Sequence, residues 1–138
     1  MKELDQLTQE LYSCVSFKKG ENPDLEKLRT LFYGDGKLIN NSKTQPEEFT
    51  VERFIQSVRQ QIEEGNIEAF HEKEASGKTE VFGKVAHRFS TFEARFDWEA
   101  PAPFVVGVNC IQFIQLDGQW LITSMVWDDE TESTILPS

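Results

Sequence analysis

Residues 104–128 read FVVGVNCIQFIQLDGQWLITSMVWD, and this stretch decides the fold. Asp117 and Gly118 form a residue pair that is typical of a two-residue hairpin turn. The sequence therefore predicts two antiparallel strands, at residues 104–116 and 119–128. Both faces of the second strand are apolar, whereas a sheet with one face in water alternates apolar and polar residues. We expect helices to cover one face and a second copy of the chain to cover the other, which gives a homodimer.

The chain before this hairpin begins with helical patterns. Apolar residues recur at three- and four-residue spacing in three segments of the N-terminal half, which predicts three helices. The first helix spans residues 3–17. The second begins with Asn22 as N-cap and ends at residues 34–36, whose two glycines can adopt positive φ. The third begins with Thr50 as N-cap and is stopped by Gly65.

After the third helix the apolar period changes to two, which predicts strands. We expect a strand at residues 67–75, a turn at 76–78 and a long strand at 80–96. His87 and Phe89 share one face of this long strand. Helices first and an antiparallel meander second are the pattern of an α+β fold, so we expect a single domain over residues 1–138.

The charge of the chain excludes several classes of partner. Twenty-four acidic against fourteen basic side chains give a net charge of −10, and the tail at residues 129–138 is acidic and solvated. Such a surface repels phosphate backbones and anionic lipids, so we expect neither nucleic acid nor a membrane as partner.

No signal-peptide pattern opens the sequence, so we expect a cytoplasmic protein. Cys14 and Cys110 form no metal-binding or redox motif; we expect buried, reduced thiols and neither a metal nor a cofactor.

Three short strings carry a resemblance to a known family: LFYGDG at residues 31–36, GVNCIQF at 107–113 and GQWLI at 118–122. Together with the order of elements, they resemble the nuclear-transport-factor-2-like superfamily, which includes ketosteroid isomerases and SnoaL-like proteins. The resemblance implies a cystatin-like cone, in which a strongly curved, mostly antiparallel sheet wraps three N-terminal helices and leaves an internal cavity. It also implies that two chains pair through the outer sheet face. Fold alone selects no activity within such a superfamily.

The resemblance also points the face of the long strand that carries His87 into the cavity, and it places three further residues there. Asn40 falls where the ketosteroid isomerases have their carboxylate base, and Asn109 falls where they have a carboxylic acid that holds the oxyanion. Tyr12 falls near their hydrogen-bonding tyrosine. An amide at Asn40 cannot take a proton from a carbon acid near neutral pH, which argues against that isomerisation. Asn109 can still donate a hydrogen bond to an oxygen of a ligand.

Four residues are candidates for ligand binding: Asn109, Tyr12, Glu93 and Trp120. The leading hypothesis is a small-molecule-binding protein with an apolar cavity, whose ligand is apolar or aromatic and carries an oxygen acceptor. The alternative is a dehydratase, isomerase or cyclase that uses His87 as acid–base group, with a carboxylate such as Glu93 to orient it. A further alternative is a protein-interaction module. Core packing of Trp120 and a structural hydrogen bond of His87 stay open as simpler interpretations.

Overall fold

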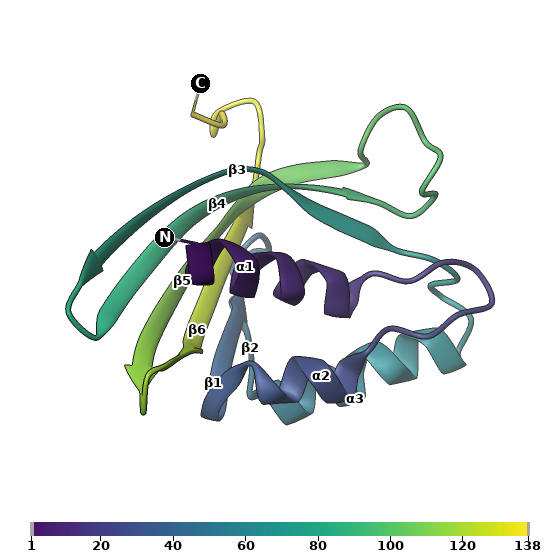
Figure 1. Cartoon of the computed structure of the whole chain (residues 1–138). Coiled ribbons are helices and arrows are strands. Elements are labelled where there is room, and N and C mark those ends of the chain that lie inside the picture. Colours follow the sequence, from purple (N-terminus) through teal and green to yellow (C-terminus); the bar gives the residue numbers. More distant parts are fainter. Residues whose placement is uncertain (1, 138) are drawn as a thin grey trace.

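Three helices lie on the concave side of a curved, six-stranded sheet in the computed structural model, which describes residues 2–137 (Figure 1). The elements in chain order are α1 (Lys2–Val15), α2 (Leu25–Thr30), β1 (Phe32–Asn40), β2 (Glu47–Phe49), α3 (Val51–Glu63), β3 (His71–Phe82), β4 (Val85–Arg95), β5 (Val105–Leu116) and β6 (Gln119–Asp129). The strand order is β2-β1-β6-β5-β4-β3. β1 and β6 are parallel, and the other pairs are antiparallel. The expected α+β architecture is confirmed, with helices on one face of a curved, mixed sheet.

The helices begin where a side chain can cap them. Thr50 Oγ1 accepts a hydrogen bond from the Arg53 amide at 3.2 Å, so the predicted N-cap of α3 is confirmed. α2 begins later than predicted, because Asp24 and not Asn22 is its N-cap. The Asp24 Oδ1 accepts a hydrogen bond from the Lys27 amide at 3.1 Å. A carboxylate at this position also faces the positive end of the helix dipole.

The predicted end of the second helix at residues 34–36 is wrong. α2 ends at Thr30, and the chain enters β1 at Phe32. Gly34 and Gly36 have φ of 58° and 63° and lie inside β1, where its pairing with β6 changes register. Positive φ is available to glycine in a strand irregularity as readily as after a helix. The glycines therefore mark a backbone irregularity, but of a different kind from the one predicted.

The turn predicted at residues 76–78 is also wrong, because β3 continues through it to Phe82. The chain turns instead at Gly83, which has a φ of 58°. Gly77 follows a register shift in the pairing of β3 with β4. A Cβ at Gly77 would overlap the guanidinium of Arg88, so the glycine permits close packing and does not form a turn.

The hairpin between β5 and β6 is confirmed. Asp117 and Gly118 both have positive φ, at 51° and 79°, as a two-residue hairpin turn requires. β2 is a three-residue strand that the sequence pattern did not reveal, because a strand so short carries no measurable alternation. It pairs with the end of β1 and leads directly into α3.

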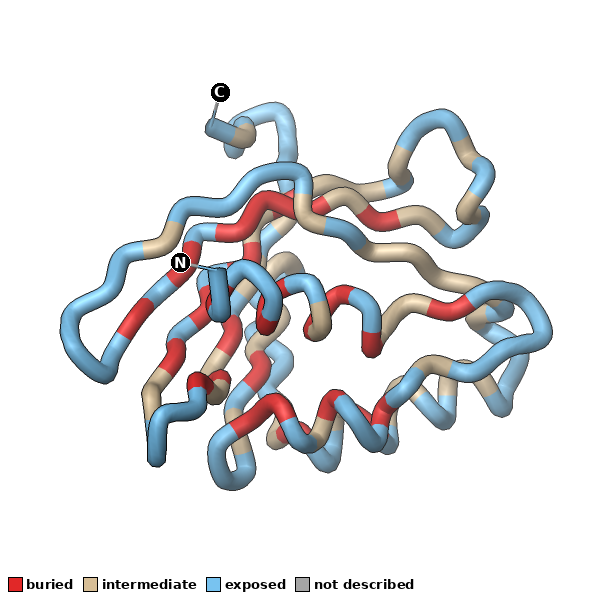
Figure 2. Tube along the Cα trace, viewed as in Figure 1, coloured by how far each residue is buried: buried red, intermediate tan, exposed pale blue. Residues whose placement is uncertain are grey.

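Exposed and buried residues alternate along the first half of β4 (Figure 2). This alternation shows which of its side chains reach the inside of the molecule. Ala86, Arg88 and Ser90 are buried on the inner face, whereas His87 and Phe89 are exposed on the outer face. The predicted inner face of this strand is therefore wrong. A shift of one residue exchanges the two faces of a strand, and the charge of Arg88 conceals the apolar pattern of the inner one.

The main core lies between the helices and the inner face of the sheet. Its fully buried apolar side chains are Leu4, Leu28, Leu38, Ile55, Ile111, Phe113 and Ile122. Cys14 is buried in this core as a free thiol. The expected burial of the other thiol is wrong, because Cys110 is exposed on the outer sheet face.

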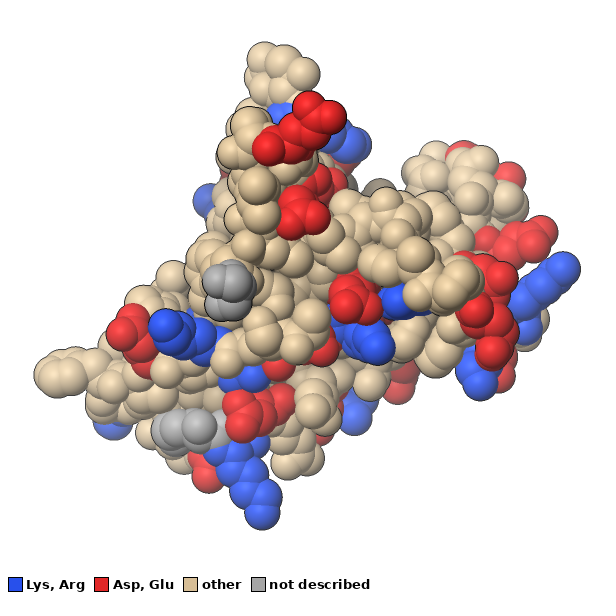
Figure 3. All heavy atoms as spheres, turned by 90° about the horizontal axis from the view of Figure 1, so that it is seen from above, with Lys and Arg blue, Asp and Glu red and all other residues tan. Residues whose placement is uncertain are grey.

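The outer face of the sheet is partly apolar. Phe89, Cys110 and Val126 form an exposed row across β4, β5 and β6. They line a shallow hollow together with residues 134–137 of the C-terminal tail. Seen from above, acidic and basic side chains are interspersed with uncharged surface (Figure 3). The second copy of the chain expected on this face stays a prediction.

None of the described helices is long and apolar enough to pass through a lipid bilayer.

Candidate functional site

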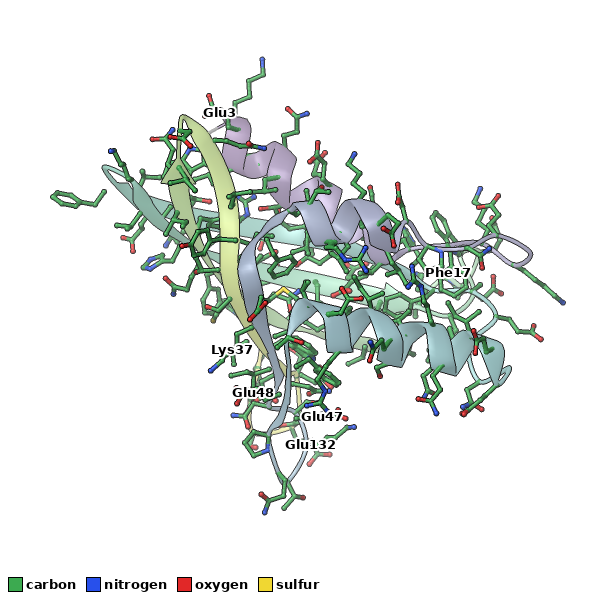
Figure 4. The ribbon with its side chains drawn as sticks, turned by 90° about the horizontal axis from the view of Figure 1, so that it is seen from below. Glu3, Phe17, Lys37, Glu47, Glu48 and Glu132 are labelled. Carbon is green, nitrogen blue, oxygen red and sulfur yellow. The ribbon has the colours of Figure 1, made fainter. Side chains whose placement is uncertain are left out.

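A mainly apolar pocket of about 290 Å³ lies between the helices and the inner face of the sheet. Its aromatic lining includes Phe54, Phe70, Phe92, Phe104 and Trp127. Its polar lining consists of Tyr12, Asn40, Ser42, Glu72, Asn109 and Asp129. Figure 4 views the molecule from the helical side and labels Phe17, a further lining residue just beyond the end of α1. The pocket can enclose an apolar group and offer it a few hydrogen-bonding partners.

A chain of hydrogen bonds runs from the pocket into the protein. The Nδ2 of Asn109, on β5, donates to the hydroxyl oxygen of Tyr12, on α1, at 2.9 Å. The Tyr12 hydroxyl and the Ser90 Oγ are 2.6 Å apart, and the Ser90 Oγ donates to Glu74 Oε2 at 2.6 Å. Because Ser90 uses its only proton on the carboxylate, Tyr12 must donate to Ser90. The Tyr12 oxygen therefore faces Asn109 as an acceptor.

Arg88 anchors the inner end of this chain. Its Nε and Nη2 donate to both carboxylate oxygens of Glu74, at 2.9 and 2.7 Å. Its Nη1 donates to Asp5, near the start of α1, at 2.7 Å and to Thr79 at 2.6 Å. Burial opposes ionisation of Glu74, but the hydrogen bonds from Arg88 and Ser90 outweigh it and lower the pKa of that carboxyl. Glu74 is thus a charged, fixed acceptor at neutral pH.

Glu72 lies two residues before Glu74, on the same face of β3, and its carboxyl reaches the pocket. Its Oε2 is 3.4 Å from the Nδ2 of Asn109. Burial raises the pKa of Glu72 to about 7, and the negative charge of Asp129 adds to the rise while Asn109 opposes it. The carboxyl can therefore gain or lose a proton near neutral pH.

The strand β3 is held at this position by α1. Ser16, just after α1, accepts at its Oγ from the Glu72 amide at 3.1 Å, and the Oγ donates to the carbonyl oxygens of Tyr12 and Glu72, which lie at 2.8 and 3.3 Å and share its one proton. Phe17 and Phe70 exchange two backbone hydrogen bonds at 2.8 and 2.9 Å. These contacts fix the end of α1 against β3, which places Tyr12 and Glu72 on the same pocket.

Asp129 supplies a second carboxyl to the pocket, from the end of β6. Burial raises the pKa of Asp129, the neighbouring Asp128 adds to the rise, and Ser42 opposes it. Asn40 organises the same region, because its Oδ1 accepts from the Ser42 amide at 2.9 Å and from the Ser42 Oγ at 2.6 Å.

Within residues 2–137 no three His, Cys, Asp or Glu side chains come together as a metal site would require.

The structure brings two of the predicted site residues together, since Tyr12 and Asn109 bond to each other at the pocket. The other three lie elsewhere. His87 is 53% exposed on the outer face, with its Nε2 2.6 Å from Glu80 Oε1, so the expectation that it faces the cavity is wrong. The physical reason is that successive residues of β4 point to opposite sides of the sheet, and the neighbours of His87, Ala86 and Arg88, take the inner side.

Glu93 and Trp120 also lie outside the pocket lining. Glu93 shares the outward face of β4 with His87 and forms an ion pair with Arg95 at 3.0 Å. Trp120 packs in the main core, and its Nε1 is buried without a hydrogen-bond partner in the part of the chain that the structure describes. The ligand-binding roles expected of these two residues therefore find no support in their positions.

Sequence reasoning missed Glu72. The useful signal is the two-residue spacing of Phe70 and Glu72, which puts the carboxylate on the same strand face as an apolar ring. Glutamates in a charged segment such as 72–74 are ordinarily solvated, so that signal is weak until the strand is placed against α1.

Replacing Tyr12 with phenylalanine tests the hydrogen-bond chain. We expect Tyr12→Phe to lower the free energy of unfolding by about 1–2 kcal/mol, because Asn109 and Ser90 each lose a buried partner. Urea unfolding followed by circular dichroism measures the change. Tyr33→Phe is the matched control, since Tyr33 is 51% exposed; it is expected to change stability by less than about 0.5 kcal/mol. Equal effects of the two substitutions would contradict the chain.

The chain is similar to several solved structures. A protein of unknown function with a cystatin-like fold from Nostoc punctiforme has a TM-score of 0.74 at 12% identity, over 95% of this chain and 91% of that one. A nuclear-transport-factor-2-like protein of unknown function from Pseudomonas putida has a TM-score of 0.72 at 10% identity, over 99% and 92%. A nuclear-transport-factor-2-like protein from Cytophaga hutchinsonii has a TM-score of 0.62 at 16% identity, over 94% and 91%.

These similarities show the fold. The fold that the resemblance implied, a nuclear-transport-factor-2-like fold, is confirmed. No family model matches the sequence, and no curated protein matches it. The activity of the pocket must therefore be argued from its own residues.

Proposed function

We propose that this chain, which has the nuclear-transport-factor-2-like fold, binds a small molecule with an apolar body and one polar group in the pocket between its helices and sheet. The observation that carries the proposal is the meeting of Glu72, Asn109 and Tyr12 in a mainly apolar lining. A pocket lined mainly by apolar side chains, with a few converging polar groups, is the usual form of a small-molecule site.

The polar groups in this pocket are ordered before any ligand arrives. Tyr12 and Asn109 are held by the chain that ends at Arg88, and both are almost fully buried. Groups that are already oriented lose little conformational entropy on binding, which increases affinity. The aromatic lining supplies the apolar contact area, and the polar groups select the orientation of the ligand.

A neutral aromatic compound, biphenyl-4-ylmethanol, tests the proposal by isothermal titration calorimetry. We expect it to bind, and we expect at least a tenfold loss of affinity in Val58→Trp, because an added indole on α3 would fill the pocket that Val58 lines. Val85→Trp is the matched control, since Val85 is exposed at the start of β4, outside the pocket lining.

Two results would contradict the proposed site. One is that the folded wild-type protein binds neither this alcohol nor the amine and the carboxylate with the same biphenyl skeleton. The other is equal affinity of the wild type and Val58→Trp, with circular dichroism showing that the variant is folded, because the compound would then bind outside the pocket.

A further inference from the structure

The ionisable side chains that line the pocket are acidic, and no basic side chain stands among its described lining residues. Two carboxyls, Glu72 and Asp129, line it, and the described lining residues include no lysine, arginine or histidine. No ion pair joins either carboxyl to another described residue. Arg88, at the far end of the polar chain, is already bonded to Glu74 and Asp5. Within residues 2–137 the pocket therefore has negative charge without a positive partner.

We propose that the ligand is a lipophilic amine, whose ammonium group pairs with Glu72 and whose apolar body lies against the aromatic lining of the pocket. The inference rests on the proposed function and names the chemical class of its ligand. It differs from the expectation drawn from sequence, which is a ligand that accepts hydrogen bonds.

The direction of the hydrogen bonds favours a donor as ligand. The proton of the Tyr12 hydroxyl is directed to Ser90, so the oxygen of Tyr12 can only accept from the pocket side. An ionised Glu72 also only accepts. An ammonium group carries three donors and no acceptor, which matches these groups. A carboxylate or phosphate on the ligand would meet Glu72 and Asp129 as like charges.

The aromatic lining of the pocket also favours a ligand with a positive charge. Phe54, Phe70, Phe92, Phe104 and Trp127 come from both the helical and the sheet side of the pocket. The faces of aromatic rings carry partial negative charge and attract cations, most strongly where water is excluded. The same rings provide apolar contact for the body of the ligand. Both halves of a lipophilic amine therefore find matching surface.

Pairing with an ammonium group requires an ionised Glu72, which makes binding depend on pH. The titratable groups that face Glu72 are Tyr12 from α1 and Asp129 from β6, with Glu74 next along its own face of β3. Burial raises the pKa of Tyr12 above its usual range, so Tyr12 stays neutral, and Arg88 keeps Glu74 ionised. With the pKa of Glu72 at about 7, its ionised fraction in the free protein rises about tenfold between pH 6 and pH 8.

Three compounds with one skeleton and different charge test the proposal: biphenyl-4-ylmethylamine, biphenyl-4-ylmethanol and biphenyl-4-carboxylate. Isothermal titration calorimetry at pH 6 and pH 8 measures each affinity. At pH 8 we expect the amine to bind at least tenfold more tightly than the alcohol, and the carboxylate to bind more weakly than either. We expect amine affinity to rise about tenfold from pH 6 to pH 8, since an alkylammonium keeps its proton in this range. The affinity of the alcohol should change less than about twofold.

Glu72→Gln keeps the shape and removes the charge, so it should abolish the preference for the amine over the alcohol. Glu80→Gln is the matched control, because it makes the same change on β3 at an exposed residue outside the pocket, and it should leave both affinities unchanged.

The outcomes separate this inference from the proposed function. Binding of the alcohol as tightly as the amine, or an amine preference that survives Glu72→Gln, would overturn the amine class and leave a small-molecule pocket standing. Failure of all three compounds to bind would overturn both.

Discussion

Replacing Arg88 with methionine is expected to lower the free energy of unfolding at pH 7 by about 3 kcal/mol. The Arg88 side chain is 6% exposed and bonds to Glu74, Asp5 and Thr79. Without it, the carboxylate of Glu74 stays largely buried, loses both N–H donors of Arg88 and keeps the hydrogen bond from Ser90. Removing one partner of a buried ion pair leaves an uncompensated charge, and this costs more than the pair itself contributes.

Urea unfolding at pH 7 measures the effect. Arg29→Met is the matched control, because Arg29 also binds two carboxylates, Glu26 and Glu52, but at the surface. Exposed pairs of this kind contribute less than about 1 kcal/mol. The double variant Arg88→Met with Glu74→Met should recover part of the loss, since it removes both charges together. Equal losses in Arg88→Met and Arg29→Met would contradict the buried anchor.

The loss caused by Arg88→Met should depend on pH. In the wild type the pKa of Glu74 lies below its unfolded value, so its stabilisation is fully present above the unfolded pKa and is lost as the pH falls through the folded pKa. The substitution removes this stabilisation. The difference between variant and wild type should therefore be largest near pH 7 and become smaller towards pH 4.

Replacing Glu72 with glutamine is expected to raise the free energy of unfolding at pH 8 by about 3 kcal/mol and to change it little at pH 4. The pKa of Glu72 rises from 4.5 to about 7 in the folded protein. A raised pKa means that the stability attached to this group is fully present below pH 4.5 and is lost as the pH rises through 7. Glutamine carries no charge to desolvate, so the variant avoids this loss.

Thermal unfolding between pH 4 and pH 8 tests this prediction, with Glu80→Gln as control for the general effect of removing a negative charge from a chain of net charge −10. The melting temperature of Glu72→Gln should exceed that of the wild type above pH 7 and approach it at pH 4. A variant that is less stable than the wild type at pH 8 would contradict a buried, unpaired carboxyl at this position.

A group that destabilises the protein at neutral pH calls for an explanation in function. Stability alone would favour an apolar or amide side chain at Glu72, since the position already faces Phe92, Ala94 and other apolar groups of the pocket lining. Titratable groups with strongly shifted pKa values gather at functional sites for this reason. The same carboxyl would gain a partner from the ammonium group that we propose as part of the ligand.

Much of the fold could be predicted because its signals are local. Thr50 caps α3 through an atom three residues away, and Asp117 with Gly118 forms the hairpin from its own backbone preference. The predictions were wrong where one residue type is compatible with more than one local structure. A glycine such as Gly34 or Gly77 can end an element, kink a strand or admit a neighbour, and only its surroundings distinguish these uses.

The amino-acid sequence by itself determined the three helices, the Thr50 cap of α3 and the β5–β6 hairpin, since each depends on residues close together in the chain. Only the tertiary structure decided which face of β4 points inward and which polar groups meet. Arg88 enters the interior because Glu74 and Asp5 neutralise it there, and they come from two other elements. Glu72 becomes a candidate site residue for the same reason: its burial depends on α1, β5 and β6 packing around it, and no window of sequence contains all four segments.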